Sequence, residues 1–126
     1  MTPLVDVITD HLAKRGHEVE VLCAPGWWPD VGRQVGEAVA AGQADAGVVC
    51  CWTGTGVCIA ANKVPGVRAA LCGDAGTASG ARKWNDANVL ALSLRLISAE
   101  VAREVIDAFM TTQPDPGESD AIARLH

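Results

Sequence analysis

A cysteine followed by a turn rich in threonine and glycine is the part of this sequence best suited to chemistry. Cys51 closes an apolar run that begins at Ala46, and Thr53-Gly54-Thr55-Gly56 follows it before a stretch of helical character. A buried strand that ends in a glycine-rich turn and opens a helix is a common place for a site in α/β proteins. The unpaired N–H groups at such a helix start favour an anion or a developing oxyanion.

The residues alone leave two interpretations of Cys51 open. A thiol beside the positive end of a helix ionises more easily than a free one, so Cys51 can serve as a base or a nucleophile. Cysteine is also among the residue types most often buried, so Cys51 can equally be a core residue of its strand. Cys50 points to the opposite face because side chains alternate along a strand, and we expect it to lie in the core.

Strands that alternate with helices must position this turn. Apolar spacing and capping residues predict strands over 18–23, 46–51, 68–72 and 89–92, and helices over 3–15, 30–41, about 75–83, 99–111 and 118–126. Such alternation favours a parallel sheet covered by helices on both faces. We therefore expect a single α/β domain over residues 1–126, a three-layer αβα sandwich with a Rossmann-like sheet of four visible strands and a tail helix within 113–126.

The composition excludes several classes of protein. The formal net charge is −5 without a basic run, which argues against a nucleic-acid partner. The sequence has no apolar stretch of about 18 residues and no signal-peptide pattern at its start, so we expect no membrane partner. The five cysteines form no Cys-x-x-Cys pair, which favours reduced thiols in the cytoplasm over disulfides or a zinc site.

Two segments together resemble the family of ribose-5-phosphate isomerase B and galactose-6-phosphate isomerase. The first runs from Cys51 through the glycine-rich turn to Ile59-Ala60-Ala61-Asn62-Lys63 and on to Ala70. The second is Asn85-Asp86-Ala87-Asn88-Val89-Leu90-Ala91. The resemblance implies an aldose–ketose isomerase that acts on a sugar phosphate as a homodimer, with each site built from both chains and with no metal or nucleotide cofactor.

The same resemblance implies roles for individual residues. Cys51 would move a proton between C1 and C2 of an open-chain sugar, Thr53 would assist, and backbone N–H groups of Thr53 to Gly56 would hold the enediolate oxygen. Asn85 matches an asparagine that contacts the sugar, and Arg95 matches an arginine that reaches the substrate phosphate, often across a dimer. A solvated arginine after a strand is an equally good interpretation of Arg95.

The chain departs from the family pattern at positions that bear on the substrate. Trp52 stands where the family usually has glycine, and Trp84 stands where it has the histidine that opens the furanose ring. An indole N–H donates a hydrogen bond but cannot act as an acid or a base. Two phosphate-binding arginines of the family's C-terminal tail are also missing, since Ser119 and Ala123 occupy those positions.

The strand that opens the family's fold has no counterpart in this sequence. In the family, which has five strands, this strand lies at the centre of the sheet and ends in an Asp-His-x-Gly turn that helps to bind the sugar. We therefore expect an N-terminally truncated domain with a gap in its sheet, or a sheet that has re-paired. Buried backbone groups without partners would each destabilise the fold by about 1–3 kcal/mol.

Four tryptophans stand out in a chain with no tyrosine and one phenylalanine. The sequence pattern places all four in loops or turns, and we expect Trp52 and Trp84 to flank the site. Their flat faces suit stacking on a sugar, and they suit a dimer contact equally well. The four residues are Trp27, Trp28, Trp52 and Trp84.

Together these features favour a sugar-phosphate isomerase that is not optimal on ribose 5-phosphate. The loss of the ring-opening group and of tail arginines leaves open a non-catalytic sugar-binding or structural homologue of the family. A third alternative is an NAD-dependent oxidoreductase, because Gly54-Thr55-Gly56 is half of a dinucleotide fingerprint, although Ile59 replaces its third glycine.

Overall fold

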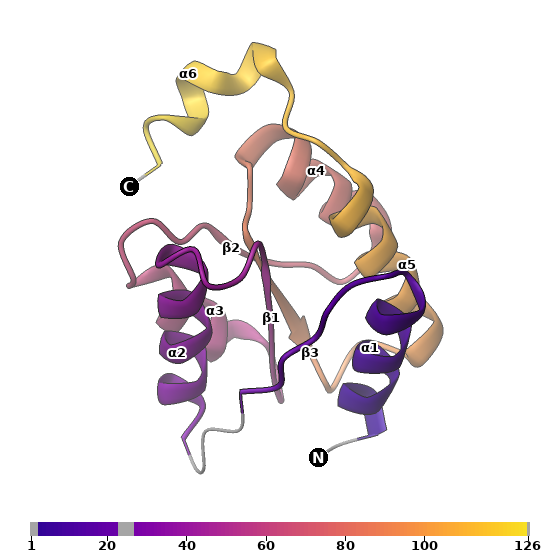
Figure 1. The fold of residues 1–126 in the computed structure, drawn as a ribbon. Coiled ribbons are helices and arrows are strands. Elements are labelled where there is room, and N and C mark those ends of the chain that lie inside the picture. Colours follow the sequence, from indigo (N-terminus) through magenta and orange to yellow (C-terminus); the bar gives the residue numbers. More distant parts are fainter. Residues whose placement is uncertain (1–2, 23–26, 126) are drawn as a thin grey trace.

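Three parallel strands form the sheet that positions the candidate site. The computed structural model describes residues 3–22 and 27–125. Strands β1 (Gly47–Cys51), β2 (Ala69–Leu71) and β3 (Val89–Ser93) lie in the order β1-β3-β2, so β3 is central (Figure 1). Every residue of β3 is buried, as expected for a parallel strand covered on both faces. The register places Gly47 beside Val89 and Cys51 beside Ser93, so the carboxyl ends of β1 and β3 meet at one end of the sheet.

Helices cover both faces of the sheet and enclose two apolar cores, which confirms the predicted α/β sandwich. One core joins α1, α4 and α5 to Leu90 and Leu92 of β3. The other joins α2 and α3 to Val49, Val89 and Ala91. The helices are α1 (Pro3–Lys14), α2 (Trp28–Ala40), α3 (Thr55–Asn62), α4 (Ala75–Asn85), α5 (Ala99–Thr111), the 3-10 helix η1 (Pro116–Glu118) and α6 (Ser119–Ile122).

The prediction of a fourth strand over 18–23 is wrong for the part of it that the structure describes. Residues 18–22 are irregular and pair with no strand, and Cys23 lies outside the described residues. An alternating pattern forms a strand only when a neighbouring strand supplies its hydrogen bonds. Within residues 3–22 and 27–125, β1 pairs with β3 alone, so its other edge is free. The described sheet therefore contains three strands and has not re-paired.

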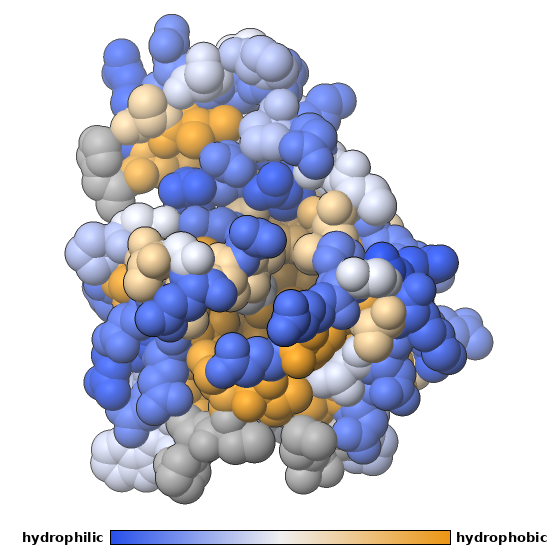
Figure 2. Space-filling view, in the orientation of Figure 1, coloured by the Kyte–Doolittle hydropathy of each residue, from blue (hydrophilic) through white to orange (hydrophobic). Residues whose placement is uncertain are grey.

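The free edge of β1 lies beside apolar side chains. Val48 and Cys50 of β1 are only partly buried although they pack against the core, and so is Val19 of the irregular segment. The same face of the molecule shows a hollow with apolar side chains in the region that β1 occupies (Figures 1 and 2). The hollow lies beside the free edge of β1, where the sequence analysis expects a gap in the sheet.

The opposite edge of the sheet is completed by a side chain. At the end of α3, Asn62 donates from Nδ2 to the carbonyl oxygen of Ala69 at 2.9 Å and accepts from the Ala69 N–H at 2.7 Å. The amide therefore bonds both backbone groups of an edge residue, as a neighbouring strand would. An edge whose hydrogen bonds are satisfied resists pairing with another chain.

The segment 85–91 has structural functions that the sequence did not reveal. Asp86 ends α4 with φ of 48°, and its carboxylate forms ion pairs with Arg68 at 3.2 Å and Arg82 at 3.0 Å. Asn88 accepts from the Arg68 N–H at 2.7 Å and donates to the carbonyl oxygen of Gly66 at 3.0 Å. These contacts hold the amino ends of β2 and β3 together.

Two of the four tryptophans do not lie in loops. Trp28 is the first residue of α2 and Trp84 lies near the end of α4, whereas Trp27 and Trp52 lie outside the helices, as expected. Trp28 can begin a helix because the next residue, Pro29, has the fixed φ that suits the first turn. The loop that the sequence pattern predicts over residues 24–29, between the expected strand and helix, is thus helical at 28 and 29, and residues 24–26 lie outside the described part.

The tail helix is shorter than the predicted 118–126, because α6 ends at Ile122. No helix in the described ranges is long and apolar enough to cross a bilayer.

Replacing Asn62 tests the side-chain cap on the sheet edge. Asn62→Ala removes the partner of the Ala69 N–H and the shorter of the two hydrogen bonds to its carbonyl oxygen, which also accepts from Cys58 Sγ at 3.5 Å. We therefore expect the free energy of unfolding in urea to fall by about 1–2 kcal/mol. The control is Lys63→Ala, which shortens an exposed neighbour at the end of the same helix. Equal stability of the two variants would contradict a cap function for Asn62.

Candidate functional site

The carboxyl ends of β1 and β3 bring together most of the residues that the sequence singled out. The chain after β3 bonds to the chain after β1, because Leu94 N–H donates to the Cys51 carbonyl oxygen at 3.0 Å and Arg95 N–H donates to that of Trp52 at 2.9 Å. The Ser93 hydroxyl also donates to the Trp52 oxygen, at 3.2 Å. Trp52 and Arg95 are therefore neighbours beside the strand that carries Cys51.

Cys51 lies against a backbone donor of its own turn. The Gly54 N–H donates to Cys51 Sγ at 3.2 Å. The sulfur therefore accepts a hydrogen bond from the turn that follows its own strand. The Cys51 side chain packs on the α2 and α3 face and is partly buried, so the sulfur lies between the core and the turn.

Cys50 lies in a different environment. It packs on the face of α1, α4 and α5, which confirms that the two adjacent cysteines point to opposite faces. Burial, and then the neighbouring Cys51 thiol, raise the pKa of Cys50 to about 11. Cys50 therefore stays protonated at neutral pH and is unsuited to act as a base.

The turn can fold back on Cys51 because residue 54 is glycine. Gly54 has φ of 78°, a conformation that L side chains rarely adopt. A Cβ at this position would also lie 2.5 Å from Leu71 Cδ1 and 2.9 Å from the carbonyl carbon and oxygen of Leu92. Both the backbone angle and the close approach to β3 require glycine here.

The helix that follows begins with unused hydrogen-bond donors. No side chain of the described residues caps the start of α3. By contrast, Asp74 accepts from the Thr77 N–H at the start of α4, and Ser98 accepts from the Val101 N–H at the start of α5. The first N–H groups of α3 are therefore available to an anion.

Two hydroxyls stand beside these donors. The Oγ1 atoms of Thr53 and Thr55 lie 2.8 Å apart, and both residues are exposed. When one hydroxyl donates to the other, the second keeps its hydrogen for a ligand. The turn thus combines a partly buried sulfur, backbone N–H groups and a hydroxyl pair within five residues.

Trp84 and Asn85 lie at the other end of the sheet from Cys51. They end α4, just before the chain enters β3 at Val89, whereas Cys51 is beside Ser93 at the carboxyl end of β3 (Figure 1). A five-residue strand spans about 13 Å, so the two groups are separated by roughly the length of β3. In this chain, both line an open pocket along α4 and β2 that contains neither Cys51 nor the glycine-rich turn.

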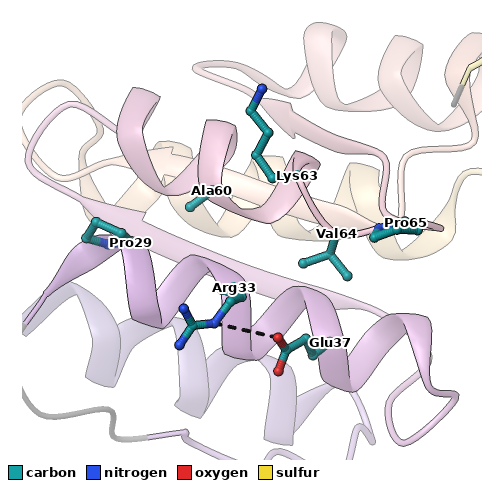
Figure 3. A pocket seen from close by; sticks show the side chains of 7 residues that line it. All are labelled: Pro29, Arg33, Glu37, Ala60, Lys63, Val64 and Pro65. Atoms are coloured by element: carbon teal, nitrogen blue, oxygen red, sulfur yellow. Dashed lines mark ion pairs between the residues drawn. The ribbon is translucent and has the colours of Figure 1, made fainter.

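A second pocket lies in the groove between α2 and α3 (Figure 3). Arg33 in this groove pairs with Asp30 at 3.2 Å and with Glu37 at 3.6 Å. Lys63, the other cationic residue that lines the groove, points out of it in Figure 3. The lining residues are Pro29, Arg33, Glu37, Ala60, Lys63, Val64 and Pro65, none of which the sequence predicted as site residues. This groove offers few free polar groups, so the chemistry points to the turn after β1 instead.

Comparisons with known proteins identify relatives over almost the whole chain. A family model described as Ribose/Galactose Isomerase matches residues 2–125. Ribose-5-phosphate isomerase B of Escherichia coli K12 is 40% identical over 87% of this chain and 76% of that protein. D-erythrulose-4-phosphate isomerase of Pectobacterium atrosepticum is 38% identical over 92% of this chain and 80% of that protein.

Solved structures agree with these relatives. Ribose-5-phosphate isomerase B of Clostridium thermocellum has a TM-score of 0.91 and 39% identity, covering 96% of this chain and 85% of that one. The enzyme of the same name from Mycoplasma genitalium, with bound ribulose-5-phosphate, has a TM-score of 0.85 and 32% identity, covering 96% of this chain and 84% of that one. The Rossmann-like α/β fold is thus shared with enzymes that are named sugar-phosphate isomerases.

Proposed function

The chain belongs to the Ribose/Galactose Isomerase family, and from this premise we propose that it interconverts an aldose phosphate and a ketose phosphate with Cys51 as the base. The observation that carries the assignment of the base is the 3.2 Å contact between the Gly54 N–H and Cys51 Sγ. It joins the thiol to a turn whose other donors are free for an oxyanion. No donor to Cys50 Sγ lies among the described residues, and burial raises the pKa of Cys50 to about 11.

In the proposed reaction, the Cys51 thiolate removes the proton from C2 of the open-chain aldose. The electrons of that C–H bond form a double bond between C1 and C2, and the C1 carbonyl oxygen becomes an enediolate oxygen. The Thr53 hydroxyl transfers the C2 hydroxyl proton to that oxygen. The Cys51 thiol then returns its proton to C1, which leaves a carbonyl at C2 and restores the thiolate.

The backbone of the turn stabilises the negative charge of the intermediate. Of its N–H groups, that of Gly54 donates to Cys51 Sγ. The N–H groups of Thr53, Thr55 and Gly56 have no partner among the described residues and are assigned to the enediolate oxygen. Donors that are already oriented need no reorganisation as the charge develops, and this gives them their catalytic effect.

Separate serine substitutions of the two adjacent cysteines test the assignment of the base. We expect Cys51→Ser to lower kcat/KM at least about 100-fold and to stop exchange of the substrate's C2 proton with D2O, because a hydroxyl is a far weaker base than a thiolate. Cys50→Ser is the matched control, and we expect it to lower the free energy of unfolding more than turnover because it places a hydroxyl in the core. NMR measures the proton exchange, and urea unfolding measures the stability.

Full activity of Cys51→Ser would refute the assignment of the base. Sugar-phosphate binding without any proton exchange in the unmodified protein would favour a non-catalytic homologue.

We further propose that two chains complete each site. One small sugar phosphate cannot bridge Cys51 at one end of β3 and Asn85 at the other end within the same chain. The C-terminal tail passes the end of the sheet at which Asn85 lies, since the Asp115 N–H donates to the Lys83 carbonyl oxygen at 2.8 Å. Trp84, Asn85 and the tail would therefore reach the Cys51 turn of a second copy, in a homodimer that buries at least about 1,200 Å² in total.

Mixing two inactive variants tests this assembly. Cys51→Ser and Asn85→Ala chains, unfolded together and refolded, should form mixed dimers in which one of the two sites has both intact residues. Random pairing then restores about a quarter of the sites, so activity should reappear on mixing. Each variant refolded alone is the control. Activity that stays at the control level, or a monomer in sedimentation at micromolar concentration, would contradict a site shared between chains.

The substrate preference follows from Trp84, which replaces the ring-opening histidine of the family. A furanose closes through the oxygen on C4, so ribose 5-phosphate must open before its C2 proton can be removed. A four-carbon sugar with its phosphate on that oxygen cannot close this ring. We therefore propose a four-carbon sugar phosphate, or another substrate that is already open, as the better substrate. The similarity to a protein named D-erythrulose-4-phosphate isomerase is consistent with this choice.

Restoring the histidine tests the preference. Trp84→His should raise kcat/KM for ribose 5-phosphate by a factor of roughly 10²–10⁴, the range typical of general acid–base groups. Its kcat/KM for erythrose 4-phosphate should change little, and the ratio of the two substrates on one protein sample removes any effect of misfolding. Equal or better turnover of ribose 5-phosphate than of erythrose 4-phosphate by the unmodified chain would overturn the proposal.

A further inference from the structure

Trp28 packs its indole against the first turn of α3. A Cβ built on Gly56 would lie 2.8 Å from both Cε3 and Cζ3 of Trp28 and 3.1 Å from Cη2. These three atoms belong to the six-membered ring of the indole. That ring therefore lies directly on the backbone of Gly56, and only glycine leaves room for it. The sequence singles out both residues without indicating that they touch.

Packing of the two helices does not account for this contact. Gly32 lies one turn beyond Trp28 on α2, and a Cβ there would be 2.7 Å from the Val57 carbonyl oxygen and 2.9 Å from Ala60 Cβ. Gly36, one turn further, approaches Val64 and Ala61 in the same way. These two glycines already bring α2 and α3 together. Trp28 extends their row past the helix contact and onto the start of α3.

Trp28 remains open to solvent on its other side. Its exposed fraction is 53%, although one ring is in contact with Gly56. A tryptophan that only fills a core is largely buried. The ring contacts Gly56, and the N–H of this residue is one of the donors assigned above to the enediolate.

We propose that Trp28 is a substrate-contacting residue that forms one apolar wall of the site. This inference rests on the proposed function, because it places the carbon chain of the sugar between the indole and the turn after β1. The C–H groups of an open-chain sugar stack well on an aromatic face. By displacing water from this side, the indole would also strengthen the hydrogen bonds from the turn to the oxyanion.

The adjacent tryptophan provides a matched control. Trp27 is 76% exposed and precedes the first turn of α2, and the three atoms nearest to a Cβ built on Gly56 all belong to Trp28. The two residues are neighbours in sequence and identical in chemistry. A wall function therefore predicts that only substitutions of Trp28 affect ligand binding.

The first test measures kinetics with erythrose 4-phosphate. We expect Trp28→Ala to raise KM about three- to tenfold with kcat changed less than about twofold, and Trp28→Phe to recover most of the loss, because an aromatic face is worth roughly this much. Trp27→Ala should leave both constants unchanged. Urea unfolding without ligand checks that each variant is folded. An unchanged KM in folded Trp28→Ala, or equal effects at positions 27 and 28, would overturn the proposal.

The second test does not depend on turnover. Titration with erythrose 4-phosphate should change the tryptophan fluorescence of the unmodified chain and of Trp27→Phe equally. The change should be clearly smaller in Trp28→Phe, where only the other tryptophans near the site, such as Trp52, still report. A smaller change only in Trp28→Phe supports the wall even if no variant shows isomerase activity, in which case the proposed function alone has failed. A change as large in Trp28→Phe as in Trp27→Phe would refute contact between Trp28 and the ligand.

Discussion

The pairing of β1 with β3 is the interaction on which the candidate site depends. Its register aligns Cys51 with Ser93, and backbone hydrogen bonds continue beyond both strands to Leu94 and Arg95. This continuation holds the chain that leaves β1 against the chain that leaves β3. Gly54 can then approach Leu92 closely and turn its N–H to the Cys51 sulfur. An uncapped start of α3 follows directly, so one strand pairing positions the sulfur, the turn and the free donors together.

The two ends of the sheet separate two groups of residues that appear equivalent in the sequence. Cys51, Trp52 and Arg95 meet at the carboxyl end, whereas Trp84 and Asn85 lie at the amino end. Around Asn85 the neighbouring Asp86 and Asn88 have all their described contacts within the fold, through Arg68, Arg82 and Gly66. Similarity to family members over the segment 85–91 thus reflects structural constraints as much as contact with a ligand.

Much of the fold follows from local patterns, because apolar runs and capping residues depend on near neighbours. The strands at 46–51 and 89–92 and the helix capped by Ser98 lie within a residue of their predicted limits. The irregular conformation of residues 18–22 was not predictable, since an alternating pattern forms a strand only where a neighbouring strand supplies its hydrogen bonds. The contacts of Gly32 with α3 and of Gly56 with Trp28 were also missed, because a glycine in a sequence indicates a break more readily than a close approach. The position of Trp84 was deducible from topology: a helix that follows a parallel strand returns the chain to the amino end of the sheet.

The amide of Asn62 has a consequence for how this sheet can be enlarged. It occupies the hydrogen-bonding positions of Ala69 that a further strand beside β2 would need. The corresponding groups of β1 face no strand among the described residues. Growth of the sheet is therefore directional: an additional strand, whatever its origin, is blocked on the side of β2 and open on the side of β1. In an assembly of several copies, this asymmetry would disfavour endless stacking of β1 on β2, because every such junction would have to break both Asn62 bonds.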